Sequence, residues 1–166
     1  MTLRIIAQPL TAEAFAAFGD VIESENQHNF YINDGNALRF HDVAKAEYQG
    51  EQAHVGISLV DVAPYQMPLA ITLMEKHPKG SQAFIPLDNQ PFLVLVAPRG
   101  PEIKPEEIKA FITNGRQGVN YHTDSWHHPL ISLNDSQRFI IVDRIGKDDN
   151  CDLFHIEPGQ LEVALD

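Results

Sequence analysis

The sequence predicts a mainly β fold, a sandwich or barrel of short strands with a few short helices. Turn-forming residues recur at short intervals, at 33–35, 88–89, 114–115 and 134–136. Between these turns lie short runs rich in Val, Ile, Phe and Leu, which is the pattern of strands joined by tight connections. No long helical pattern alternates with the runs, so a parallel sheet with crossover helices is not expected.

Eight segments are expected to form regular structure. The expected strands, in chain order, are Val55–Val62, Leu69–His77, Ser81–Leu87, Pro91–Ala97, His128–Leu133 and Gln137–Ile145. Two segments are expected to be helical. Thr11 is a suitable N-cap for a helix that Gly19 would end, and Pro105–Phe111 begins with Pro and two glutamates.

The run Leu69–His77 carries the clearest candidate site residues. Alternate side chains of an extended chain share a face, so Glu75 and His77 lie together beyond three apolar residues. The next run is expected to return after a turn as the antiparallel partner, which brings Gln82 near His77. This arrangement predicts a packed barrel floor with polar groups at the mouth.

Length and charge exclude several classes of function. With 166 residues the chain is expected to be a single domain, residues 1–166, because domains commonly have about 100–200 residues. The formal net charge is −11, which argues against a nucleic-acid partner or an anionic membrane surface. Its longest apolar run, Phe92–Pro98, is far shorter than the roughly 18 residues of a membrane span. Cys151 is the only cysteine, and the N-terminus lacks a signal-peptide pattern, so a cytoplasmic location is expected.

A second candidate stretch, NYHTDSWHHPL, spans Asn120–Leu130. Together with the first stretch it is similar to the two-motif pattern of the cupins, with His77 and His122 at matching positions. Glu75 stands where the first cupin motif has its first His, and Gln82 where that motif has Glu. The resemblance implies a cupin-like double-stranded β-helix, also called a jelly-roll barrel.

A finer resemblance covers nearly the whole chain. It rests on LRFHD (Leu38–Asp42), EKHPKGSQAFIP (Glu75–Pro86), AFITNGRQGVNYHTDSWHHPL (Ala110–Leu130), IVDRIG (Ile141–Gly146) and DNCD (Asp149–Asp152). These segments resemble the ureidoglycolate lyase family, formerly called ureidoglycolate hydrolases. The resemblance implies a homodimeric enzyme of purine (allantoin) breakdown that converts (S)-ureidoglycolate to glyoxylate and urea. It also implies a divalent metal, Ni²⁺.

The chemistry of that reaction needs proton transfer, and histidine or a carboxylate supplies it near neutral pH. We expect His77, Gln82 and His122 to form the binding centre, as metal ligands or substrate contacts. Glu75 or His128 is expected to be the acid–base partner. Further contacts to the substrate are expected from side chains near the matched motifs: Gln82, Lys79, Arg39, Asn120 and Arg144.

The other histidines, Trp126, Cys151 and Asp143 are assigned expected positions in the fold. Only one of the adjacent His127 and His128 is expected to face the pocket, because neighbours in an extended chain point to opposite sides. Trp126 is expected in the core or at the rim, and Cys151 is expected to be buried and inert. Asp143 shares parity with apolar neighbours and would need a polar partner if buried. His28, His54 and His155 are expected at the surface or at strand edges, and His41 at the mouth or at an interface.

Three alternative functions remain open at this stage. One is another metal-dependent cupin enzyme, an isomerase or a dioxygenase, acting on a small organic acid. Another is a non-catalytic cupin that binds a small molecule. The third is amidohydrolysis of ureidoglycolate, which releases ammonia instead of urea.

Overall fold

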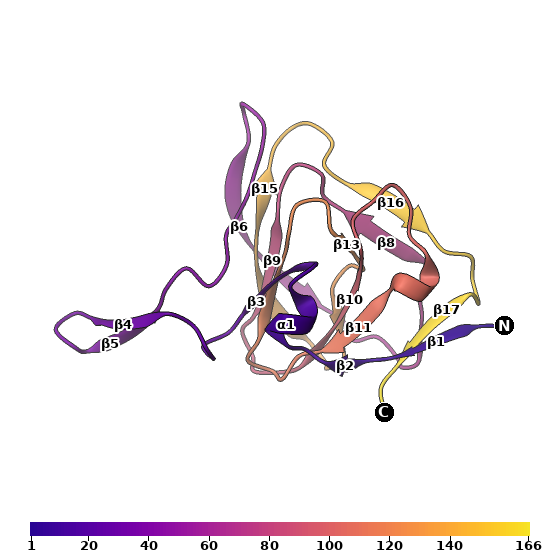
Figure 1. The fold of residues 1–166 in the computed structure, drawn as a ribbon, viewed down its shortest axis with the longest axis horizontal. Coiled ribbons are helices and arrows are strands. Elements are labelled where there is room, and N and C mark those ends of the chain that lie inside the picture. Colours follow the sequence, from indigo (N-terminus) through magenta and orange to yellow (C-terminus); the bar gives the residue numbers. More distant parts are fainter.

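Two sheets face each other and form the barrel of the computed structural model, which describes residues 1–166 (Figure 1). The five-stranded sheet contains, in spatial order, β3 (Gly19–Ile22), β12 (Gly118–Tyr121), β9 (Gln82–Pro86), β15 (Gln137–Ile145) and β6 (His54–Val62). The other sheet has the order β16 (Asp152–His155), β8 (Leu73–Lys76), β13 (Trp126–His127), β10 (Phe92–Ala97), β11 (Lys109–Ile112) and β2 (Gln8–Pro9), with β14 (Ile131–Ser132) also paired to β10. The predicted mainly β, cupin-like fold is confirmed.

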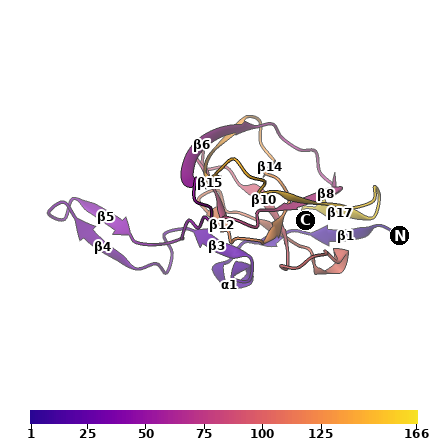
Figure 2. The same ribbon diagram turned by 90° about the horizontal axis from the view of Figure 1, so that it is seen from above.

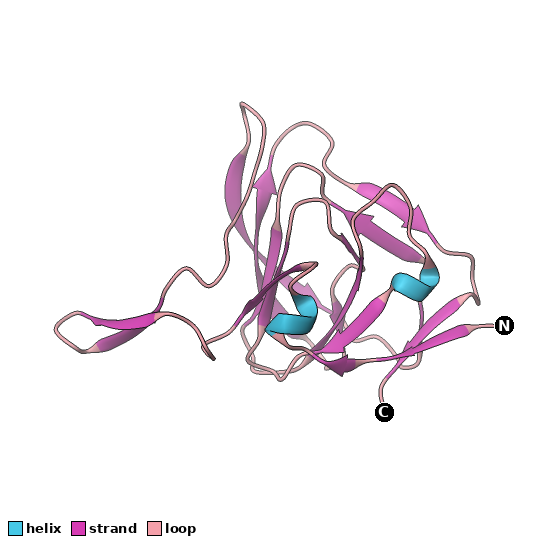
Figure 3. Ribbon diagram, viewed as in Figure 1, coloured by secondary structure: helices cyan, strands magenta, loops and turns pink.

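Three smaller parts complete the chain. A three-stranded sheet contains β1 (Leu3–Ile6), β17 (Leu161–Ala164) and β7 (Leu69–Ala70). The strands β4 (Asn29–Ile32) and β5 (Ala37–Phe40) form a separate hairpin that projects from the barrel (Figure 2). The helical segments are α1 (Ala12–Phe15) and the 3₁₀ turn η1 (Pro105–Glu107), both short (Figure 3). Neither has the length and apolar content that a membrane-crossing helix requires.

The strand β10 is buried on both faces and separates two apolar cores. Phe92, Val94 and Val96 point to the barrel interior, where they pack with Phe15 and Phe139 among others. The alternate residues of β10 join a second core, which includes residues of β7, β8 and β17. Because alternate side chains of β10 lie in different cores, all of them are apolar. This explains the continuous apolar run Phe92–Ala97 in the sequence.

The expected strand Leu69–His77 is interrupted, because its two halves belong to different sheets. Leu69–Ala70 pairs with β17, and Leu73–Lys76 pairs with β13 and β16. The expectation that Ser81–Leu87 pairs with this run is wrong, because β9 pairs with β12 and β15 in the opposite sheet. Gln82 nevertheless returns to His77, across the barrel interior rather than along a ladder.

The other expected elements are present but shorter. Thr11 caps α1, with its Oγ accepting a hydrogen bond from Ala14 N at 3.2 Å, but Gly19 begins β3 instead of ending the helix. The Pro105 segment is a single 3₁₀ turn, because Lys109–Ile112 pairs with β10. The run His128–Leu133 is a strand only at Ile131–Ser132.

Candidate active site

The inner faces of the two sheets each contribute one row of polar side chains. In the seven-stranded sheet, Glu75 of β8 is the register partner of His127 of β13. In the five-stranded sheet, Gln82 of β9 lies between Tyr121 of β12 and Asp143 of β15. Register partners on neighbouring strands present their side chains on the same face. The two rows meet inside the barrel, where the Tyr121 and His127 rings stack with centroids 4.1 Å apart and planes 6° apart.

Glu75, His77, Gln82 and His127 form a polar cluster there, which we call the barrel cluster. Gln82 Oε1 lies 3.1 Å from His77 Nε2 and 3.2 Å from His127 Nε2. Glu75 Oε1 lies 3.7 Å and 3.5 Å from the same two nitrogens. The candidate ligand atoms of Glu75, His77 and His127 are all within 4.8 Å of one another. Two imidazoles and a carboxylate are a donor set suited to divalent transition metals.

Backbone carbonyls fix the position of the hydrogen on both imidazoles. His77 Nδ1 lies 2.7 Å from the carbonyl oxygen of Asn150, and His127 Nδ1 lies 3.0 Å from that of Ser125. A carbonyl oxygen only accepts hydrogen bonds, so each Nδ1 carries a hydrogen. In its neutral form each ring then has its lone pair on Nε2. Both lone pairs face the centre of the barrel cluster. A carbonyl on the far ring nitrogen is the usual support of a metal-binding histidine.

Burial sets the charge of two aromatic groups in this region. Burial lowers the pKa of His127, and the neighbouring Glu75 carboxylate, which favours the protonated ring, offsets only part of that effect, so the neutral ring is favoured. Burial also raises the pKa of Tyr121, with a smaller contribution from the negative charge of Glu75, so its phenol keeps its proton.

The barrel cluster is partly exposed, and Cys151 lies beside it. The side chains of Glu75 and His77 are 19% and 15% exposed, whereas that of His127 is 1% exposed. Cys151 is exposed, and its Sγ lies 3.8 Å from Glu75 Oε2. The expectation that Cys151 is buried is therefore wrong. Partial loss of water around the sulfur and the negative charge of Glu75 raise the pKa of the Cys151 thiol.

His122 and Asn120, expected at the site, lie outside the barrel cluster. Tyr121 points inward, so its two neighbours point to the outer face of the sheet. There His122 Nε2 lies 3.0 Å from Asp20 Oδ1, and Asn120 Nδ2 donates to Asp20 Oδ2 at 3.0 Å. His122 borders a separate pocket of about 380 Å³, which we call the outer pocket. Its charged and imidazole lining residues are Asp20, Asp42, Lys45, Glu47, Arg99 and His122.

His128 likewise lies apart from the barrel cluster. It follows His127 in the chain, and its Nδ1 donates to the carbonyl oxygen of Pro129 at 2.7 Å. Its ring packs edge-on against Tyr65, with centroids 6.2 Å apart. Trp126, the other neighbour of His127, lies in the second core, as expected of a structural aromatic residue.

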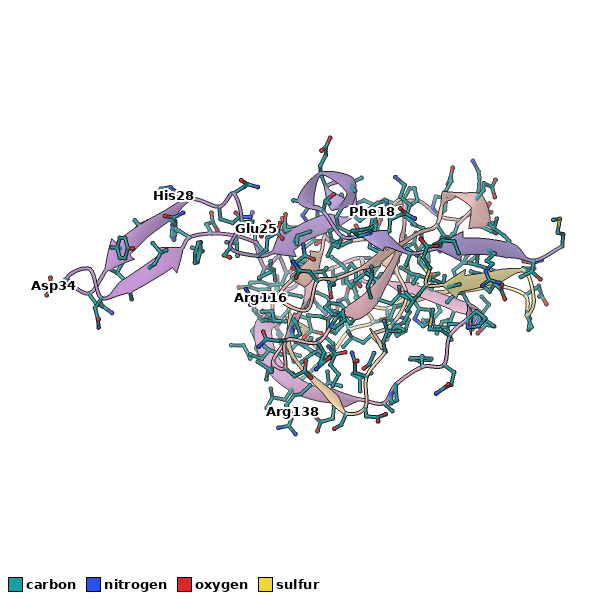
Figure 4. The ribbon with its side chains drawn as sticks, turned by 90° about the horizontal axis from the view of Figure 1, so that it is seen from below. Phe18, Glu25, His28, Asp34, Arg116 and Arg138 are labelled. Atoms are coloured by element: carbon teal, nitrogen blue, oxygen red, sulfur yellow. The ribbon has the colours of Figure 1, made fainter.

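The cationic side chains that were expected to contact the substrate lie away from the barrel cluster. Lys79 Nζ donates to Asp148 Oδ2 at 2.7 Å, and the buried Arg144 binds both Asp148 and the carbonyl oxygen of Gln49. Arg39 lies on β5 of the projecting hairpin, whose labelled residues His28 and Asp34 extend away from the barrel (Figure 4). No lysine or arginine side chain makes an ion pair with Glu75.

Three residues of this region were not assigned to the site from the sequence: Tyr121, Asp143 and His127, although one of His127 and His128 was expected to face the pocket. For His127 a signal existed, because a core position of Trp126, one of its two expected places, turns His127 to the opposite face by alternation. For Tyr121 and Asp143 the deciding information is the strand register, which brings both beside Gln82 and which no local pattern contains.

Comparison with known proteins identifies the family. A family model described as ureidoglycolate lyase matches residues 2–164. The chain is 46% identical over 160 residues to a ureidoglycolate lyase of Pseudomonas savastanoi pv. phaseolicola, covering 96% of this chain and 94% of that protein. It is 50% identical over 161 residues, with the same coverage, to a ureidoglycolate lyase of Pseudomonas paraeruginosa.

Among solved structures, a dTDP sugar isomerase from Desulfovibrio desulfuricans G20 aligns over 82% of this chain and 84% of its own at 12% identity, with a TM-score of 0.47. That likeness is too slight to decide function. The family model and the bacterial relatives cover almost the entire sequence, and the chain therefore belongs to the ureidoglycolate lyase family.

Proposed function

We propose that the protein is a ureidoglycolate lyase, a carbon–nitrogen lyase that cleaves (S)-ureidoglycolate to glyoxylate and urea in allantoin breakdown. The observation that carries the proposal is the match to this family along almost the whole chain. The barrel cluster supports it, because it supplies an acid–base group and metal-type ligands in one partly enclosed place.

The reaction moves one proton from oxygen to nitrogen. The hydroxyl of the substrate loses its proton as the carbon–oxygen double bond of glyoxylate forms. The ureido nitrogen gains a proton as the carbon–nitrogen bond breaks, and urea leaves. We assign both transfers to Oε2 of Glu75, which lies beside Cys151, because Oε1 is the oxygen that lies beside the two imidazoles of the metal site.

The donor set fits the divalent metal, Ni²⁺, that the family resemblance implies. Glu75, His77 and His127 would hold the ion, and Gln82 Oε1 lies beside both imidazoles. When bound, such an ion supplies a Lewis acid for the hydroxyl and carboxylate oxygens of the substrate. A positive charge is needed there, because Lys79 and Arg144 are committed to Asp148 and Lys76 points away to Asp124.

The first test is a product assay on purified protein with (S)-ureidoglycolate. Urea and glyoxylate should appear in equal amounts. Ammonia without urea would replace this proposal with amidohydrolysis, and oxygen uptake without urea would favour a dioxygenase.

Substitutions separate the barrel cluster from the outer pocket. His77→Ala and His127→Ala should each lower kcat/KM by more than the roughly 10–100-fold that loss of a support behind a metal ligand costs, because each removes a ligand itself. The exposed His155→Ala serves as a control and should keep full activity. If His122→Ala abolishes turnover while His127→Ala does not, the reaction belongs to the outer pocket instead.

We also propose that the single domain, residues 1–166, forms a cytoplasmic homodimer. The support is the concentration of exposed apolar side chains on two surfaces, the hairpin and β6. They include Phe30, Tyr31, Leu38, Phe40, Ile57 and Leu59. A lone hairpin is marginally stable in water, so a second copy that covers it is a suitable partner. Sedimentation analysis should give twice the chain mass of 18.6 kDa.

A further inference from the structure

Asp143 is a half-buried carboxylate in the barrel wall without a cation beside it. It lies on β15 in register with Gln82 of β9, and Gln82 Nε2 donates to its Oδ2 at 3.1 Å. This is the only side-chain hydrogen bond of Asp143, and the carboxylate forms no ion pair. A half-buried carboxylate needs a polar partner, and the amide of Gln82 is that partner.

The amide of Gln82 has two ends with opposite hydrogen-bonding character. Nε2 donates and Oε1 accepts, so the amide can turn its oxygen to Asp143 only by placing two acceptors against each other. The carboxylate therefore holds Nε2 on its own side and turns Oε1 towards His77 and His127.

This orientation leaves the barrel cluster with acceptors alone. The two Nε2 lone pairs, Gln82 Oε1 and the Glu75 carboxylate converge, and the hydrogens of both rings are held by Asn150 and Ser125 on the far side. Four acceptors and one negative charge repel one another unless a positive charge lies among them. A turned amide would instead donate its N–H to the imidazole lone pairs and satisfy them without any ion.

We propose that Asp143 is a positioning residue that, through Gln82, keeps the barrel cluster as an all-acceptor site for a divalent cation. Asp143 acts on the cation only through the amide, whose oxygen it presents as a further ligand beside Glu75, His77 and His127. This inference deepens the proposed metal site and rests on that part of the proposed function.

The test exchanges the amide and the carboxylate between the two strands. In Asp143→Asn the amide of Gln82 is free to turn, because the new amide at position 143 can donate to Oε1. In the double variant Asp143→Asn with Gln82→Glu, one oxygen of the new carboxylate accepts from the new amide and the other faces the two imidazoles. The total charge of the double variant is that of the wild type.

Metal-free proteins are titrated with Ni²⁺ alone, and the dissociation constant is measured by calorimetry or equilibrium dialysis. Asp143→Asn should weaken binding by about 10–100-fold, as for other supports of metal ligands. The double variant should recover most of the lost affinity. Asp61→Asn on the neighbouring strand, where Asp61 pairs with Arg138 at the surface, should bind Ni²⁺ like the wild type.

Three results would overturn the proposal: no Ni²⁺ binding by the wild type, unchanged binding by Asp143→Asn, or a double variant no better than Asp143→Asn. A merely structural role of Asp143 would not be reversed by Gln82→Glu, and thermal unfolding of each variant confirms that it folds. The urea assay is a separate readout, so a protein that binds Ni²⁺ as described but releases no urea would contradict the proposed reaction and leave the role of Asp143 standing.

Discussion

Alternation within a two-residue strand decides which histidine reaches the barrel cluster. His127 belongs to β13 and faces inward against Tyr121, whereas Trp126 faces the second core. His127 then pairs with Glu75 across the ladder, and one residue of slip would put Trp126 in its place. The strand register therefore determines which histidine joins the barrel cluster.

The pKa of the Cys151 thiol depends on the charge of Glu75. Because burial and the Glu75 carboxylate raise its pKa, little thiolate is present near neutral pH. We predict that Glu75→Gln speeds the labelling of Cys151 by iodoacetamide at pH 7.5, since the negative charge beside the thiol is removed. Mass spectrometry gives the rate, and Glu157→Gln, at an exposed turn, is the matched control. Equal rates in all three proteins would show that Glu75 does not control the thiol.

Single residues also mark the limit of sequence reasoning about the site. Glu75, His77 and Gln82 were predicted, because parity and one short turn already bring them close. His122 was expected with them but bonds to Asp20 on the outer face, since Tyr121 takes the inward position. The pairing of β12 with β3 and β9 places Tyr121 on the inner face. This pairing depends on residues far apart in the chain, so no local sequence pattern predicts it.

The predicted strands also divide into those that local sequence determines and those that contacts with distant residues alter. Four of the six predicted strands, those near β6, β9, β10 and β15, are found almost as expected, because turn residues bound each of them. Leu69–His77 was predicted as one strand because its pattern is continuous. The chain instead changes sheets within it: Ile71 N donates to the carbonyl oxygen of Leu161, and Thr72 O accepts from Ile156 N.

The short helix α1 packs against the floor of the barrel. Its Phe15 is fully buried and packs against Phe111 and Tyr121, and Tyr121 in turn supports the ring of His127. We predict that Phe15→Ala lowers the free energy of unfolding by about 3–5 kcal/mol, the range for a large aromatic side chain removed from a core. Denaturant unfolding measures this, with the exposed Leu87→Ala expected to change little. A loss under about 1 kcal/mol would mean that the floor collapses around the gap.

At the scale of the whole molecule, the two cores are continuous through β10. The strand contributes alternate side chains to each core, so neither can be lost without exposing one face of β10. We therefore expect the chain to unfold as one cooperative unit, with near-UV and far-UV circular dichroism changing together. Separate transitions for the two signals would contradict the proposal that the chain is a single domain.

The stability of the whole molecule should also depend on pH through two buried histidines. Burial lowers the pKa of His127 and of His128 below the value of about 6.5 that they have in the unfolded chain. The unfolded chain then binds protons that the folded chain does not, so stability rises with pH through this range and is lost as the pH falls below about 6.5. The midpoint of thermal unfolding of the metal-free protein should therefore be lower at pH 5.5 than at pH 7.5. His128→Gln should flatten this dependence, because one of the two groups is removed, whereas the exposed His155→Gln should not. A wild-type midpoint that is equal at both pH values would show that neither histidine is buried in its neutral form.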